Sequence, residues 1–263
     1  MKKLLIAGAT LTALIGTPAL AADMALKAPP PAAPVSTWSG CYIGLHGGVA
    51  FGRSPTMSWM DVNPGPGSGA IQYDPINFGR SSTSDGIGGA QLGCNWQVSP
   101  SYVLGLEGDA SWTRLSNSAS VNTLSAGGVP FGAGSVAMTE KTDFLGSVRG
   151  RAGFLWSGAL FYATGGVAWA HENFTGMESY PNPAFTSATS FSKTPTGWVA
   201  GAGVETMIKA NWLLRAEFLY YGFNGTTSTV PVVPFIALHP ANIYGYGSNN
   251  IGVVRVGLSY KFN

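Results

Sequence analysis

Few side chains in this chain are of the types that perform catalysis or bind metals. The sequence of 263 residues holds three histidines, His46, His171 and His239, and two cysteines, Cys41 and Cys94. The histidines show no metal-ligand spacing, and the cysteines do not form a Cys-x-x-Cys pair. No serine, histidine and aspartate set suggests a nucleophilic triad. The sequence therefore predicts a protein that is not an enzyme and that has no catalytic, metal or cofactor site.

The charged residues are scarce but regularly placed. They make up 10% of the chain, whereas soluble domains have about 25%. Eight of them fall on alternate positions of segments whose other positions are apolar. These eight are Glu107, Asp109, Arg149, Arg151, Glu205, Arg215, Glu217 and Arg255. Half are cationic and half anionic, so the set is formally balanced.

Strand-like segments must position this set. In the last of them one parity is wholly apolar and ends on aromatics, while the residues between are small or charged. The apolar parity comprises Val254, Val256, Leu258, Tyr260 and Phe262. This pattern suits a strand with one face towards lipid and the other towards a polar interior. Eight such segments occur, at Trp38–Gly52, Ser84–Val98, Tyr102–Leu115, Thr142–Trp156, Leu160–Phe174, Thr196–Ile208, Asn211–Phe223 and Asn249–Phe262.

The connections between these segments alternate between short and long. Three are tight turns, at 99–101, 157–159 and 209–210, and four are long and rich in Gly, Pro, Ser, Thr and Asn, at 53–83, 116–141, 175–195 and 224–248. Outer-membrane barrels have this alternation of periplasmic turns and external loops. We therefore predict an all-β fold, an eight-stranded antiparallel transmembrane β-barrel with short periplasmic turns and four long external loops. The alternative, a secreted β-sandwich, has no reason to keep its long loops at one end.

The two faces of the predicted strands differ in charge. The residues that we assign to the outward face, such as Leu45, Leu106 and Leu214, include no charged residue, and their aromatics lie at two levels, beside the tight turns and towards the long loops. Such levels match the interfacial girdles of membrane proteins. The eight charged residues all face inward, where the interior of an eight-stranded barrel is just wide enough for side chains to fill. Because isolated buried charges are costly, we expect a paired network that plugs the lumen; the alternative is a charged ion path.

The N-terminal segment predicts export. Lys2 and Lys3 precede an apolar stretch that is too short for a membrane helix, and Ala19-Leu20-Ala21 fits a cleavage site. We therefore assign 1–21 to a signal peptide, 22–37 to a Pro/Ala-rich periplasmic tail and 38–263 to the barrel, in the cell outer membrane. Without Lys2 and Lys3 the basic residues equal the 12 acidic ones, which gives no support for a nucleic-acid partner.

The two cysteines fall near the periplasmic ends of adjacent predicted strands. Since the periplasm is oxidising, we predict a cross-strand disulfide between Cys41 and Cys94. A catalytic or redox role is the weaker alternative.

Motifs at both ends of the mature chain resemble a known family. Trp38-Ser39-Gly40-Cys41-Tyr42-Ile43-Gly44, the stretch 89–95 (GAQLGCN) and the ending 256–262 (VGLSYKF) are similar to the small alphaproteobacterial outer-membrane β-barrel proteins. That porin-like family is related in architecture to the transmembrane domains of OmpA and OmpX. The resemblance implies that Val256, Leu258, Tyr260 and Phe262 form the C-terminal signal that the barrel-assembly machinery recognises. Asn263 departs from the family, in which the last residue is usually aromatic.

The resemblance implies a surface protein with roles in envelope integrity or host interaction. The expected partners are outer-membrane lipid and lipopolysaccharide, the barrel-assembly machinery and periplasmic chaperones during biogenesis, and a host or extracellular ligand at the loops. We therefore favour a structural and surface-interaction barrel with a filled polar lumen. Two alternatives stay open: a narrow ion-conducting channel, and a haem-binding receptor that uses loop residues such as His239, Tyr180 or Met177, as the resemblance suggests.

Overall fold

The computed structural model describes residues 37–53, 56–62, 74–78, 82–122, 124–126, 129–130, 134–181, 184–209, 211–236 and 239–262. All of them belong to the second of two compact units, Ser36–Asn263. The predicted signal peptide and all but the last residue of the predicted tail lie outside the described residues. No helix in the described part of the chain has the length and apolar character needed to cross a membrane.

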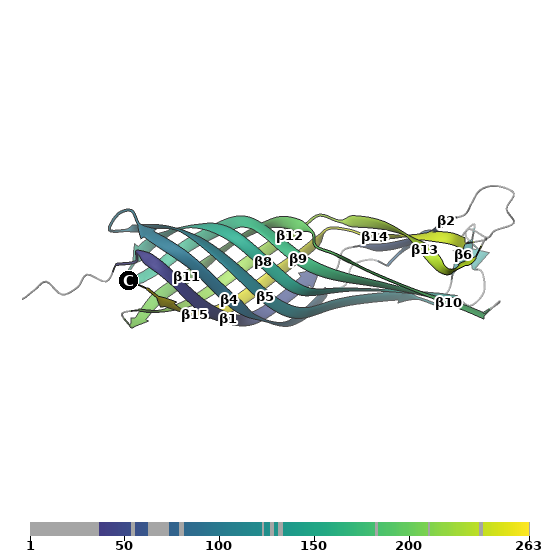
Figure 1. Ribbon diagram of the computed structural model, residues 1–263, viewed down its shortest axis with the longest axis horizontal. Helices are drawn as coiled ribbons and strands as arrows, with labels where there is room; N and C mark the ends of the chain where they lie inside the picture. Colours follow the sequence, from purple (N-terminus) through teal and green to yellow (C-terminus); the bar gives the residue numbers. More distant parts are fainter. Residues whose placement is uncertain are drawn as a thin grey trace, which may run out of the picture. The chain divides into compact units, whose positions relative to one another are not determined.

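Eight antiparallel strands form a closed barrel, in which they run side by side with a common tilt (Figure 1). Each strand pairs with the next one along the chain, and the last pairs with the first, so that Leu45 lies opposite Leu258. The predicted eight-stranded fold is confirmed. In chain order the barrel strands are β1 (Gly40–Arg53), β4 (Ser82–Gln97), β5 (Tyr102–Val121), β8 (Ser135–Trp156), β9 (Ala159–Pro181), β11 (Thr196–Lys209), β12 (Trp212–Phe223) and β15 (Asn249–Lys261).

The segments predicted as long loops contain further strands. β5, β8 and β9 each continue past their predicted outer ends, and β10 (Ala184–Lys193) pairs with the outer part of β9. A second sheet has the order β13-β14-β2-β3, and β6 pairs with β7. Thr, Val and Tyr are frequent in these segments and suit pleated, half-buried surfaces. The bounds are β2 (Met57–Val62), β3 (Ile76–Asn77), β6 (Ser125–Ala126), β7 (Val129–Pro130), β13 (Thr226–Ile236) and β14 (His239–Tyr246).

The outer face of the barrel is a band of exposed apolar side chains. Leu45 on β1 is 69% exposed, and Val148, Phe154 and Val256 are about half exposed. Aromatic contacts between adjacent strands gather at its two edges. At the turn end these are Tyr102–Phe154, Trp156–Phe161 and Trp212–Tyr260, and at the other end Trp112–Phe144 and Trp198–Tyr220. We call the strand residues beyond the Trp112–Phe144 level, together with β2, β3, β10, β13 and β14, the external extension.

A β-bulge on β8 marks the boundary between the band and the external extension. Phe144 lies opposite Trp112 on one side and His171 on the other, whereas Thr142 lies opposite Leu115 and Glu172. Asp143 is therefore the extra residue on the β8 side of the β9 ladder, and such an insertion reverses which parity faces inward. Below the bulge the buried residues of β8 have odd numbers, apart from Gly146, and above it they have even numbers.

Candidate functional site

The eight charged residues predicted for the lumen all lie inside the barrel. Glu107 and Asp109 come from β5, Arg149 and Arg151 from β8, Glu205 from β11, Arg215 and Glu217 from β12, and Arg255 from β15. All eight are buried, and the most exposed of them, Asp109, is only 8% exposed. Their common direction follows from the period of two along each strand, which sends alternate side chains to the same face.

Each arginine contacts at least two carboxylates. Arg149 lies 2.5 Å from Glu107, 3.0 Å from Asp109 and 3.1 Å from Glu217. Arg255 continues the network, at 2.7 Å from Glu217 and 3.2 Å from Asp109. Because every charge has an opposite charge within reach, the cost of removing these groups from water is offset by Coulomb attraction and charge-assisted hydrogen bonds.

One ion pair crosses the full width of the barrel. In the ring of eight strands, β5 and β12 are four positions apart and therefore stand opposite each other. The Arg215 Nη1 atom of β12 nevertheless lies 2.5 Å from Glu107 Oε2 of β5. Arg215 also lies 2.8 Å from Glu205, and Arg151 lies 3.4 Å from the same carboxylate. Side chains from opposite walls thus meet in the middle of the lumen.

Neutral polar residues complete the network, and the sequence analysis did not assign them to the lumen. The Tyr42 hydroxyl donates to Glu107 and accepts a bond of 2.8 Å from Arg151. The Tyr162 hydroxyl donates to Glu217 over 3.0 Å. His46 contacts Gln91 through Nδ1, and Arg255 donates to its Nε2 atom over 3.2 Å. The alternation along each strand could have identified them, because these residues share the inward parity with the charged ones.

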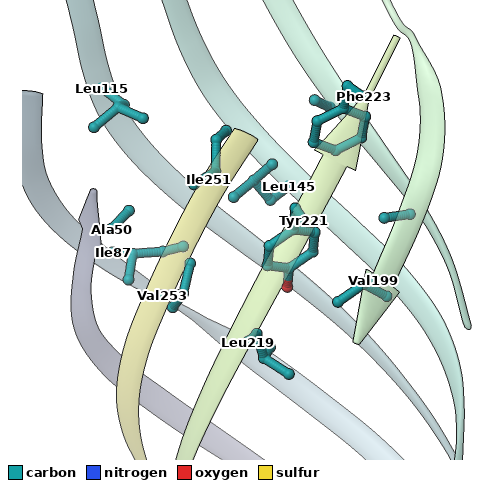
Figure 2. Close-up of a cluster of buried hydrophobic side chains, with 12 residues drawn as sticks. Ala50, Ile87, Leu115, Leu145, Val199, Leu219, Tyr221, Phe223, Ile251 and Val253 are labelled. Carbon is teal, nitrogen blue, oxygen red and sulfur yellow. The ribbon is translucent and has the colours of Figure 1, made fainter. Parts of the chain in front are cut away.

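Apolar layers close the lumen on both sides of the charge network. Along β12 the inward residues read Leu213, Arg215, Glu217, Leu219 and Tyr221. Leu213 belongs to a buried cluster at the turn end, with Trp38, Val103 and Leu160. Leu219 and Tyr221 belong to a second cluster on the other side, in which side chains from several strands converge (Figure 2). The second cluster comprises Ala50, Ile87, Leu115, Leu145, Ala168, Ala170, Val199, Leu219, Tyr221, Phe223, Ile251 and Val253.

The lumen is therefore more apolar than the sequence analysis anticipated. A layer of ion pairs lies between two apolar layers. Such an interior holds the barrel strands together.

The predicted disulfide is present. Cys41 of β1 and Cys94 of β4 lie directly opposite each other in the ladder and are bonded. The bridge joins β1 to β4 near the end of the barrel that carries the tight turns.

Of the residues predicted as an assembly signal, Val256, Leu258 and Tyr260 lie on the outer face of β15, and Phe262 directly follows this strand. Val256 and Phe262 are at least half exposed, and Leu258 and Tyr260 are about 40% exposed. They belong to the band that faces lipid, and their role in assembly stays a prediction.

The residues suggested for haem do not form a described site. Met177 on β9 is half exposed, whereas the side chains of Tyr180 and His239 lie outside the described ones. Of the other histidines, His46 is part of the lumen network, and His171 contacts Thr194 at 3.4 Å. The described residues include no group of three or more His, Cys, Asp or Glu side chains that could hold a metal ion.

The family model and the curated relatives that match this chain are of outer-membrane proteins. The family model described as "Outer membrane protein beta-barrel domain" matches residues 18–262. The 31 kDa outer-membrane immunogenic protein of Brucella melitensis is 34% identical over 97% of this chain and 98% of its own length. The 25 kDa outer-membrane immunogenic protein of Brucella canis is 28% identical over 100% of this chain and 99% of its own. Among solved structures, the outer membrane protein OprG from Pseudomonas aeruginosa is 16% identical, covering 86% of this chain and 97% of its own with a TM-score of 0.43.

Proposed function

Because the chain belongs to the outer membrane protein beta-barrel domain family, we propose that it is a structural and surface-interaction barrel of the cell outer membrane. In this proposal the barrel contributes to envelope integrity, and the external extension makes contacts outside the cell. The description of the Brucella relatives as immunogenic supports an external end that is presented to a host.

The closed lumen is the observation that carries the proposal. The contact between Arg215 and Glu107 spans the barrel at 2.5 Å, and apolar clusters lie on both sides of it. An ion would have to separate buried ion pairs, whose mutual attraction offsets the cost of removing these charges from water, and to cross both apolar layers. This requirement argues against the narrow-channel alternative and moves the site of function to the external end.

The outer face supports the proposed partners. Its apolar band and aromatic edges fit outer-membrane lipid and lipopolysaccharide. We further propose that the barrel-assembly machinery reads Val256, Leu258, Tyr260 and Phe262 on β15, after periplasmic chaperones have delivered the unfolded chain. A host or extracellular ligand would meet the external extension.

Complementation of a deletion strain tests the proposal. We compare the full chain with a variant in which residues 226–246, the β13–β14 hairpin, are replaced by a short turn that leaves β12 and β15 intact. Both forms should restore resistance to detergent, because the barrel itself supports the envelope, whereas only the full chain should restore binding to host cells or matrix. Full binding by the shortened variant, or no change of envelope resistance in the deletion strain, would contradict the proposal.

A further inference from the structure

A second buried polar cluster lies in the external extension, beyond the second apolar layer. Glu140 of β8 and Glu172 of β9 face inward on neighbouring strands, at diagonal positions of the ladder, since Glu172 lies opposite Thr142. Glu140 is 2% exposed and Glu172 is 5% exposed. Within the described part of the chain neither carboxylate forms an ion pair with a lysine or an arginine, in contrast to every carboxylate of the lumen network.

One amide group joins the two carboxylates. The Asn249 Nδ2 atom of β15 donates to Glu140 Oε1 and to Glu172 Oε1, each over 2.9 Å. The amide therefore lies between the two acids, but it supplies no charge. Two buried carboxylates held around one neutral group are an unfavourable arrangement unless a proton or a cation neutralises them.

Further oxygen atoms of the cluster are buried and have no hydrogen-bond partner among the described residues. They are Glu140 Oε2, Asn249 Oδ1 and the hydroxyl of Tyr246 on β14. Asn249 and Tyr246 are each 3% exposed, and Tyr246 interacts electrostatically with Glu140. Native proteins rarely leave buried polar atoms unsatisfied, so each such atom calls for an explanation such as an ion.

From this cluster we infer that Glu140, Glu172, Asn249 and Tyr246 form a binding site for a divalent cation of the calcium type. All the donor atoms are oxygens, which hard cations prefer. The ligands come from four different strands, and calcium tolerates such irregular sets of six to eight oxygens, whereas magnesium demands near-ideal octahedral geometry. A rotation of the Asn249 amide by half a turn would direct its Oδ1 atom, in place of Nδ2, towards the ion.

An open cleft gives access to this site. The cleft has a volume of about 370 Å³ and is lined by Glu172, Lys193 and the segments 194–196 and 224–225. Water from the cleft would complete the coordination of the ion. Lys193 lies opposite Glu172 in the ladder, and its amine donates to the Thr227 carbonyl over 3.5 Å.

Burial and the nearby Glu172 carboxylate raise the pKa of Glu140 to about 8, and burial raises the pKa of Glu172.

Calcium titration of the refolded chain tests the inference. The mature protein is folded in an uncharged detergent without lipopolysaccharide, which is itself a cation binder, and Ca²⁺ binding is measured by calorimetry at pH 7.5. We expect one ion per chain with a Kd of about 10⁻⁴–10⁻³ M, the range of extracellular calcium modules. Terbium luminescence excited through tyrosine, with displacement by Ca²⁺, provides an independent readout near Tyr246.

Matched glutamine variants locate the ion. Glu140→Gln and Glu172→Gln keep the side-chain shape and remove one carboxylate, so each should weaken Ca²⁺ binding at least about tenfold. Glu178→Gln is the control, because Glu178 is equally buried in the external extension but accepts bonds from Trp59, Asn242 and Tyr244; binding should be unchanged. Heat-modifiable gel mobility shows that each variant is folded.

Two results would overturn the inference. One is the absence of saturable binding by the folded wild-type chain up to about 10 mM Ca²⁺, well above the expected range, which would leave the pair occupied by a proton only. The other is undiminished binding by both Glu140→Gln and Glu172→Gln, which would place the ion elsewhere. The first result is obtained with the wild-type chain alone, so the inference is tested even if the variants do not fold.

Discussion

Replacing Arg149 by methionine keeps most of the side-chain volume but removes the charge that joins three carboxylates. Arg149 Nη2 lies 2.5 Å from Glu107 and 3.0 Å from Asp109, and Nη1 lies 3.1 Å from Glu217. The arginine side chain is completely buried. Removing one partner of a buried pair costs about 3–5 kcal/mol, because the remaining charge is left without compensation.

The other arginines of the network decide where in this range the cost of removing Arg149 falls. Glu107 keeps Arg215 at 2.5 Å, and Glu217 keeps Arg255 at 2.7 Å. No carboxylate is left alone, so we expect a loss near the lower limit, about 3 kcal/mol of the free energy of unfolding. The double variant Arg149→Met/Glu217→Gln restores the charge balance and should recover about 1–2 kcal/mol of that loss, a coupling in the range found for neighbouring residues.

Urea unfolding in lipid vesicles, followed by tryptophan fluorescence, measures these changes. Arg114→Met on β5 is the matched control, because Arg114 is exposed and exposed substitutions usually change stability by no more than about 0.5 kcal/mol. The reasoning is refuted if Arg149→Met costs no more than Arg114→Met, or if adding Glu217→Gln destabilises the single variant further.

Three further predictions concern strand packing, the lipid face and pH. At Gly48, a Cβ atom would lie 2.0 Å from the Val254 carbonyl oxygen, whereas at Gly47 the nearest atom would be 3.8 Å away. The folded fraction, measured by gel mobility, should therefore fall in Gly48→Val, whereas Gly47→Val should fold. Leu45 is 69% exposed, so Leu45→Arg should lower the free energy of unfolding in a bilayer by about 2–4 kcal/mol, as measured by urea unfolding. A negligible loss would argue against a lipid-facing position. In EDTA, folding holds a proton on Glu140, whose pKa is about 8, and the unfolded chain releases that proton near pH 4.5. Stability should therefore fall as pH rises from about 4.5 to about 8, by 4–5 kcal/mol at most, and Glu140→Gln should flatten this slope; an unchanged slope would show that Glu140 does not titrate in this way.

The sequence predicted the barrel strands and their inward charges because both depend on a period of two. β4, β12 and β15 begin and end within two residues of the predicted segments. Arg215 and Glu217 alternate with the exposed Leu214 and Phe218 along β12, so their direction could be derived without knowledge of the fold. Which arginine meets which glutamate could not, because a contact such as that between Arg215 of β12 and Glu107 of β5 depends on the curvature of the whole barrel.

Features that interrupt the period of two escaped prediction. The bulge at Asp143 reverses the parity of β8, so Glu140 and Thr142 face inward although the alternation of the lower strand would direct them outward. The inward apolar layer was not predicted either, because apolar residues such as Leu145 and Val199 are of the same types as those that face lipid. In the external extension, Ser- and Thr-rich segments such as β10 resemble loops in composition and become strands only by pairing with β9.

Planar-bilayer recording of the folded wild-type chain tests the central claim most directly, with a general porin as the positive control. The contact between Arg215 and Glu107 and the two apolar layers predict that insertion of the chain produces no steady conductance. A steady, sizeable conductance from protein shown to be folded by its gel mobility would contradict the account, because ions would then cross a lumen that the side chains fill.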